Sequence, residues 1–293
     1  MRDPVRAIAD AVLYEGYLLW PYRRSATKNR QRWTFGGVYP PAHSAAHPDD
    51  PSALQAQVAV EGTPRVDARV RFLHVVERAL FDRDGRRVDE LVIDGERHLA
   101  WDEATEREVV ATPGRTQFEI AGRTNRDGAM RRSWQRVTGI VDVQADDSRV
   151  TVRIENTTPW DGADRDDALR HTFCSTHVVL RAEGGAFVSA TETDCENVGL
   201  WPVLVGEEGA RDTVLAAPII LSDYPQIAPE SPGDLFDATE IDKLLVLNVL
   251  ALTPEEQSEM RASDPRACEI LERCASLSPD DLMRLHGALR EAR

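Results

Sequence analysis

Alternation of apolar and polar residues with a period of two runs from Leu54 to Ser189, and no other feature constrains the fold of this chain as strongly. Successive side chains of a β-strand point to opposite faces, so the pattern predicts strands with one buried face. Turn residues at 82–85, 145–148 and 183–185 predict antiparallel hairpins between neighbouring strands. The predicted strands are 57–60, 66–76, 88–93, 135–144, 150–154, 172–180 and 186–190. Many short strands at this spacing indicate an antiparallel β-sandwich or an open barrel.

Helix signals occur at the two ends of the chain. Asp3 and Pro4 are a favourable N-cap and first helical residue, and apolar residues follow them at helical spacing, which predicts a first helix. Residues 30–39 then alternate like a strand, and 42–52 are predicted to be a polar loop. Further helix start signals lie near the C-terminus, at Asp237, Thr253, Asp264 and Ser278. The predicted fold class is therefore α+β, with an antiparallel sandwich or open barrel core and a C-terminal helical segment.

Three prolines separate the β-like region from the helical tail, at 225, 229 and 232. Each proline fixes its own φ and removes a backbone donor, so 223–233 is predicted to be a stiff irregular segment, neither helix nor central strand. This segment divides the chain into three parts. They are an N-terminal helix and basic-aromatic segment at 1–52, a β-rich core domain at 53–222, and a proline-rich loop with helices packed on the core at 223–293.

The net charge of −15 argues against nucleic-acid binding, because such binding draws most of its affinity from neutralising phosphates. The charge is uneven: arginine and lysine are concentrated in the first 40 residues, and the chain from Trp201 onward is acidic. The two ends could face each other or simply be solvated. Alternatively, they could be two docking faces of opposite sign.

Nothing in the sequence indicates a membrane span or a secretory signal. No apolar run approaches the ~20 residues that a membrane helix needs, and Met1–Asp10 has no basic segment followed by an apolar one. The four cysteines form no C-x-x-C pair, so we expect reduced thiols. These observations predict a cytoplasmic protein without membrane insertion.

One group of residues has the composition of a metal site, and it could hold zinc or nickel. Its members are His171, Cys174, His177 and Cys195. If 172–180 is a regular strand, His171 and His177 share one face and Cys174 points to the other, so binding one ion would require a β-bulge. The alternative is that Cys174 packs in the core and the histidines are exposed or hydrogen-bonded.

Two segments are candidates for contact with a protein partner. Arginines interleaved with aromatic residues between Tyr14 and Tyr39 could grip a protein or an internal acidic face, and the proline segment has an acidic edge. The candidate partner-binding residues are Tyr17, Trp20, Arg23, Arg24, Lys28, Arg30, Asp223, Tyr224 and Glu230. No nucleophile elbow, Walker A loop, dinucleotide fingerprint or H-E-x-x-H motif occurs, so we name no catalytic residue.

Several longer motifs carry a resemblance to a known family. They include Tyr14-Glu-Gly-Tyr-Leu-Leu-Trp-Pro-Tyr-Arg, Ser175-Thr-His177, Asn197-Val-Gly-x-Trp-Pro-Val-Leu-Val-Gly206, Asp223-Tyr-Pro-Gln-Ile-Ala-Pro-Glu-Ser-Pro-Gly-Asp-Leu-Phe-Asp237 and Leu282-Met-x-Leu-His-Gly287. With these motifs the chain resembles a family of uncharacterised proteins encoded in operons for actinobacterial-type, oxygen-tolerant NiFe hydrogenases.

The resemblance implies a context and not an activity. The chain lacks the paired C-x-x-C motifs of a hydrogenase large subunit and a cysteine set fit for an iron–sulfur cluster. The resemblance therefore implies an accessory protein for assembly, maturation or docking. Such a protein would bind a hydrogenase subunit or a maturation protein and would need no cofactor. The alternative is a metal-dependent enzyme or metal-handling protein that uses His171, Cys174, His177 and Cys195.

Overall fold

The computed structural model describes residues 3–30, 32–162, 164–226 and 242–278. The chain divides into two compact units. Unit 1 consists of Met1–Leu13, Trp33–Arg78 and Asp102–Gln226, and unit 2 of Tyr14–Arg32, Ala79–Trp101 and Ile227–Arg293, apart from the residues outside the described ranges. Each unit draws on more than one of the three segments predicted from the sequence. Across the described ranges, no helix has the length and apolar character needed to cross a membrane.

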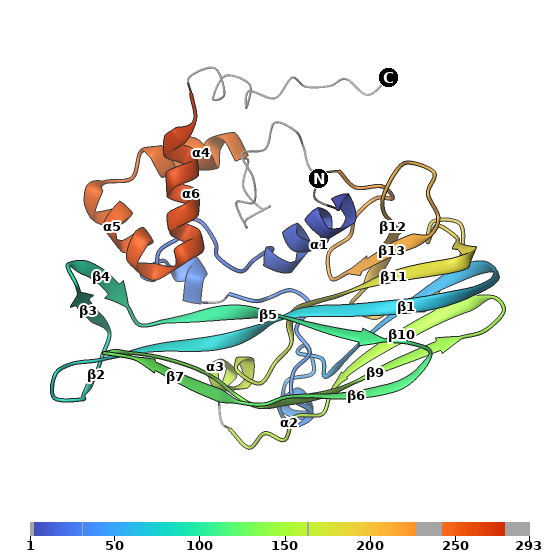
Figure 1. Cartoon of the computed structure of the whole chain (residues 1–293), viewed down its shortest axis with the longest axis horizontal. Helices are drawn as coiled ribbons and strands as arrows, with labels where there is room; N and C mark the ends of the chain where they lie inside the picture. Colours follow the sequence, from blue (N-terminus) through green and yellow to red (C-terminus); the bar gives the residue numbers. More distant parts are fainter. Residues whose placement is uncertain (1–2, 31, 163, 227–241, 279–293) are drawn as a thin grey trace. The chain divides into compact units, whose positions relative to one another are not determined.

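Unit 1 is built on a large antiparallel sheet whose longest strand is β1, Ala53–Phe81. β1 pairs first with β10 (Arg149–Asn156) and then with β11 (Cys174–Phe187). The main strand order is β12-β13-β11-β1-β10-β9-β6 (Figure 1). The remaining strands of this order are β12 (Trp201–Leu204), β13 (Thr213–Ala217), β9 (Val137–Ala145) and β6 (Gly114–Ile120). Beside them lie β5 (Trp101–Ala111), β7 (Arg123–Asp127) and β8 (Met130–Trp134).

One apolar core joins the strands of unit 1. Leu54, Ala56 and Val58 alternate along β1 and are buried together with residues of β9, β10, β11 and β13. Because the sheet is antiparallel and does not close on itself, the predicted α+β class with a sandwich or open barrel core is confirmed. The predicted hairpins at 82–85 and 145–148 are also present, since Asp82 N–H donates to Arg86 O and Asp146 N–H donates to Arg149 O.

Three local predictions are wrong. The hairpin at 183–185 does not exist: β11 continues through it, and its pairing with β1 shifts register opposite Gly62. Residues 30–39 form no strand among the residues described there, only an isolated bridge between Val38 and Phe173. The loop at 42–52 begins with a short helix, α2 (Pro41–Ala46). β5 to β8 were not predicted, because their exposed faces leave little apolar alternation; every residue of β7 is exposed.

Helix α1 (Pro4–Tyr14) begins where the Asp3-Pro4 pair predicted, and Asp3 Oδ1 accepts a hydrogen bond from Val5 N–H at 3.0 Å. Within unit 1, Val5, Ala9 and Val12 of α1 share a buried apolar cluster with residues of β11, β12 and β13. The helix therefore covers one face of these strands. A further short helix, α3 (Arg165–Leu169), precedes β11.

Unit 2 contains three of the predicted helices, α4 (Asp242–Leu250), α5 (Pro254–Ser263) and α6 (Pro265–Ser276). The predicted helix start at Thr253 is a capping box with Glu256, and Asp264 caps α6 as its start signal predicted, whereas the start signal at Asp237 lies outside the described residues. The unit also holds the 3-10 helix η1 (Thr27–Arg30), β2 (Arg87–Val88) and a hairpin of β3 (Glu90–Ile93) and β4 (Glu96–Leu99). The helix predicted from Ser278 onward and the prolines at 229 and 232 lie outside the described residues.

Candidate functional site

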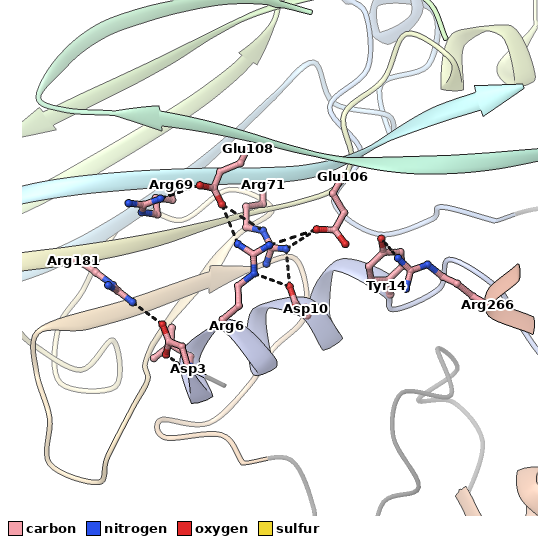
Figure 2. Close-up of polar contacts among 11 residues, drawn as sticks. Asp3, Arg6, Asp10, Tyr14, Arg69, Arg71, Glu106, Glu108, Arg181 and Arg266 are labelled. Atoms are coloured by element: carbon pink, nitrogen blue, oxygen red, sulfur yellow. Dashed lines mark hydrogen bonds and ion pairs between the residues drawn. The ribbon is translucent and has the colours of Figure 1, made fainter. Parts of the chain in front are cut away.

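A group of charged side chains in unit 1 lies where α1 faces β1, β5 and β11 (Figure 2). We call it the arginine cluster. Its members are four arginines and four carboxylates: Arg6, Arg69, Arg71, Arg181, Asp3, Asp10, Glu106 and Glu108.

Arg71 is the centre of the arginine cluster, and its side chain is only 3% exposed. Its Nη2 donates to Asp10 Oδ1 at 2.6 Å and to Glu106 Oε2 at 3.1 Å. Its Nη1 is buried and has no hydrogen-bond partner in the described part of the chain. Burying a charged group costs several kcal/mol unless it is paired, so the two carboxylates are needed to hold Arg71 in place.

Glu108 accepts hydrogen bonds from two further arginines of the cluster, Arg69 and Arg6. Arg69 Nη1 donates to Glu108 Oε1 at 2.9 Å, and Arg6 Nη1 donates to Glu108 Oε2 at 3.2 Å. At the start of α1, Arg181 Nη2 donates to Asp3 Oδ2 at 3.0 Å. The carboxylates thus share the arginines among them, which fixes α1 on the sheet by charge as well as by apolar packing.

Two hollows adjoin the arginine cluster. A pocket of about 200 Å³ is lined by charged residues of the cluster, namely Asp3, Arg6, Arg69, Arg71, Glu108 and Arg181. A wider groove of about 560 Å³ shares Val5 and Arg181 with that pocket, and its other charged residues are mostly acidic. Two surfaces of opposite charge character therefore lie side by side on unit 1.

His177 is directly opposite Arg71 in the β1–β11 ladder and is fully buried. Burial, reinforced by the charge of Arg71, lowers the pKa of His177 from 6.5 to about 3. Its Nδ1 lies 3.4 Å from Ser175 O, and its Nε2 has no hydrogen-bond partner among the described residues. His177 is therefore neutral at physiological pH, and no imidazolium is present at this position.

The β-bulge that a metal site would require is present. Arg71 pairs with His177 but Leu73 pairs with Cys174, so β11 holds one extra residue, and Ser175 has a positive φ of 51°. Even so, over residues 3–30, 32–162, 164–226 and 242–278 no three His, Cys, Asp or Glu side chains are placed to hold one ion.

The other candidate metal ligands have separate surroundings. Cys174 is fully buried and adds to the effect of burial in raising the pKa of Tyr39. His171 Nδ1 lies 3.0 Å from Asp167 O. Cys195 Sγ lies 3.6 Å from Thr193 Oγ1. The structure therefore does not bring together the four residues that the sequence grouped.

The part of the basic-aromatic segment from Tyr14 to Arg32 belongs to unit 2 and contacts acidic residues of that unit. Arg23 Nη1 lies 3.0 Å from Glu256 Oε1, and Arg24 Nη2 lies 2.9 Å from Asp89 Oδ1. Tyr17 Oη donates to the buried Asp264 at 2.7 Å. The acidic start of α5 and the N-cap of α6 are therefore the internal acidic face that the charge pattern allowed.

The other candidates in this segment are placed as follows. The ring of Trp20 packs edge-on against Tyr22, at 5.9 Å between centroids. Lys28 is exposed, and the side chain of Arg30 lies outside the described part of the structure. In the same unit, Arg266 donates to the Tyr14 hydroxyl and stacks over the Tyr14 ring, with its Cζ 3.6 Å from the centroid (Figure 2).

Asp223 and Tyr224 close the edge of the sheet in unit 1. Asp223 Oδ1 accepts from Leu204 N–H at 2.8 Å, and Tyr224 N–H donates to Leu204 O at 2.7 Å. These bonds occupy the outer side of β12, the end strand of the order, where Pro202 has no N–H to offer. Glu230 lies outside the described residues.

Helix α4 in unit 2 is apolar on two faces. Leu245, Val246 and Val249 are buried. On the other face, Leu244, Leu247 and Leu250 are 51%, 43% and 39% exposed. A spacing of three places these leucines along one side of the helix, and we call them the leucine stripe.

Sequence reasoning missed both the arginine cluster and the leucine stripe. Arg69 and Arg71 occupy the polar positions of an alternating strand, and the tail helix was recognised only by its start signal. A signal for the stripe did exist, because apolar residues around the whole circumference of a short helix indicate two covered faces.

No protein-family model matches the chain, and a search of curated proteins finds no match.

Proposed function

We propose that this protein is a non-catalytic accessory that acts by binding another protein, and that its partner is a subunit of a NiFe hydrogenase or a maturation protein of that enzyme. The leucine stripe of α4 is the observation that supports a binding role. The motif resemblance described above supports the choice of partner. The proposal rests on both.

The energetic argument concerns Leu244, Leu247 and Leu250. A surface helix normally keeps one polar face toward water, whereas α4 presents three leucines on the face opposite its buried one. Contiguous exposed apolar residues mark interaction sites more often than isolated ones do. Full burial of a leucine stabilises by about 1.5–3 kcal/mol, so covering the half-exposed stripe would contribute roughly 2–4 kcal/mol to an interface. The mode that fits is an apolar helix face packed into a groove or against a helix of the partner.

Binding of purified components tests the proposal. The full chain is combined with a purified NiFe hydrogenase large subunit in precursor form, with the small subunit and with the maturation proteins, and the affinity is measured by biolayer interferometry. We expect one of these proteins to bind and Leu247→Glu to weaken that binding by at least about tenfold. Val110→Glu is the matched control, because Val110 is 52% exposed on β5 of unit 1 and is expected to leave binding unchanged.

Each other outcome counts against the proposal. Failure of every hydrogenase component to bind the wild-type chain would overturn the choice of partner. Binding that Leu247→Glu leaves intact would show that the interface lies elsewhere. Self-association that the same substitution abolishes would identify a second copy of the chain as the occupant of the stripe.

Substituting the arginines of the basic-aromatic segment is a poor test of partner binding. Arg23 and Arg24 pair with Glu256 and Asp89 inside unit 2, so their substitution would change contacts within that unit as well as any contact with a partner. The leucines of the stripe are 39–51% exposed and form no ion pairs, so their substitution changes an exposed surface without breaking a charged contact of unit 2.

A further inference from the structure

Arginines outnumber acids among the residues that line the pocket beside the arginine cluster, although Asp10 and Glu106, which pair with Arg6 and Arg71 outside the lining, bring the whole cluster to zero net charge. Of its lining residues, Arg6, Arg69, Arg71 and Arg181 carry four positive charges, and Asp3 and Glu108 carry two negative charges, so the net charge of the lining is +2. Its volume of about 200 Å³ suits a small molecule and not a polymer.

One buried donor in this pocket has no acceptor. Arg71 lines the pocket, its side chain is 3% exposed, and its Nη1 has no hydrogen-bond partner in the described ranges. Buried polar groups are nearly always hydrogen-bonded, and a bound water or ion is one of the explanations for an exception. A guanidinium N–H is a donor with no acceptor capacity, so the missing partner must offer a lone pair.

The charge of the surroundings decides between a neutral and an anionic partner. The acids of the cluster pair with Arg71 through Nη2 and, at 3.9 Å, through Nε, which leaves the Nη1 side to an added group. Arg181 lines the same pocket, and its side chain is 54% exposed beside its ion pair with Asp3. An anion in the pocket would therefore meet Arg181 directly, and it would reach Arg71 Nη1, which is sealed from solvent, after a small movement of the neighbouring side chains that leaves the acids on Nη2 and Nε in place.

We propose that this pocket binds a small oxyanion, the phosphate or carboxylate group of a small molecule, through Arg71 Nη1 and Arg181. Planar guanidinium groups match the geometry of both groups and form short charge-assisted hydrogen bonds with them. Glu108 is the competing anion, since it occupies Arg6 and Arg69 on the rim. The acidic groove next to the pocket repels a second negative group, which favours ligands with one anionic end.

Isothermal titration calorimetry on the full chain tests this proposal, with inorganic phosphate in one arm and acetate in the other at low ionic strength. We expect saturable binding in at least one arm, and the arm that binds identifies the class of anion. Arg181→Gln should weaken binding by about tenfold or more, because it removes one charge-assisted contact. Glu108→Gln should tighten binding, because it removes the competing charge.

Arg153→Gln is the control, since Arg153 is 47% exposed, pairs with Glu155 on β10 and does not line the pocket. Arg71→Gln is also predicted to abolish binding, but the half-exposed Arg181 gives the cleaner test if that variant fails to fold. The proposal is overturned if neither anion binds the wild type and the Glu108→Gln variant. It is equally overturned if Arg153→Gln weakens binding as much as Arg181→Gln does, because the attraction would then be diffuse.

Discussion

Replacing Asp264 by alanine is predicted to destabilise unit 2 strongly. Asp264 is 1% exposed. Its Oδ2 accepts from Tyr17 Oη at 2.7 Å and from Trp101 Nε1–H at 3.1 Å, and its Oδ1 caps α6 by accepting from Arg266 N–H at 2.8 Å. One carboxylate therefore joins Tyr17 of the basic-aromatic segment, Trp101 at the start of β5 and the first turn of α6.

The magnitude follows from these three bonds. Asp264→Ala removes the carboxylate that accepts from the hydroxyl of Tyr17 and the indole N–H of Trp101 in a buried site, at about 1–3 kcal/mol for each lost bond. Loss of the N-cap of α6 adds about 1 kcal/mol. We therefore expect the free energy of unfolding to fall by at least about 3 kcal/mol. Asp264→Asn retains one acceptor oxygen, which is enough to cap α6, but its NH2 group replaces the oxygen that accepts from Tyr17 and Trp101, so its cost should be smaller than that of Asp264→Ala by about the value of the cap.

Urea unfolding combined with hydrogen exchange of α6 and of residues 14–32 measures this effect where it arises. Tyr17→Phe completes a double-mutant cycle: because it removes one of the same bonds, its cost and that of Asp264→Ala should add to more than the cost of the double variant. Unchanged exchange of α6 in Asp264→Ala, or a loss below about 1 kcal/mol, would refute the reasoning, since the carboxylate could not then be the common acceptor.

Three further predictions concern unit 1. The pKa of His177 is lowered to about 3, so below its unfolded pKa of 6.5 the unfolded state binds more protons. The contribution of neutral His177 to the free energy of unfolding should be fully present above pH 6.5 and should decrease toward pH 3 by up to about 1.4 kcal/mol per pH unit. His177→Gln should therefore make the urea midpoint less dependent on pH over this range. Asp223→Ala should leave Leu204 N–H unpaired, cost about 1–3 kcal/mol and promote edge-to-edge association in sedimentation velocity. Mass spectrometric metal analysis should find the same metal content in the wild type and in a variant lacking the four candidate ligands; stoichiometric zinc or nickel lost in the variant would contradict the separate environments described here.

The features that the sequence predicted correctly are set by local physics. The capping box at Thr253 and Glu256 and the N-cap at Asp264 act within one helical turn, and both occur where the sequence placed them. The burial of Leu54, Ala56 and Val58 follows from strand alternation alone. Each of these features needs information from only a few neighbouring residues.

The features that the sequence could not predict depend on which distant segment of the chain covers a given face of the sheet. Arg69 and Arg71 have the same place in the alternation, yet Arg69 is half exposed and Arg71 is 3% exposed, because α1 covers the sheet at Arg71. The turn predicted at 183–185 failed for a related reason. Its glycines instead serve a register shift between β11 and β1 opposite Gly62, and a turn and a bulge use the same residue type.

The two charged ends of the sequence suggested docking faces. In the structure, however, Arg23 and Arg24 of the basic-aromatic segment already form ion pairs with Glu256 and Asp89. A partner that used Arg23 or Arg24 would have to displace Glu256 or Asp89 and would gain little, since exposed ion pairs are worth at most about 1 kcal/mol. Leucine side chains form no ion pairs, so a partner that packed on the leucine stripe would not have to displace one. Partner binding through the stripe should therefore persist or strengthen between about 0.1 M and 1 M salt, where charge attraction is screened and apolar burial is not. Binding that weakens steeply over this range in equilibrium measurements would show that charged side chains, and not the stripe, carry the interface.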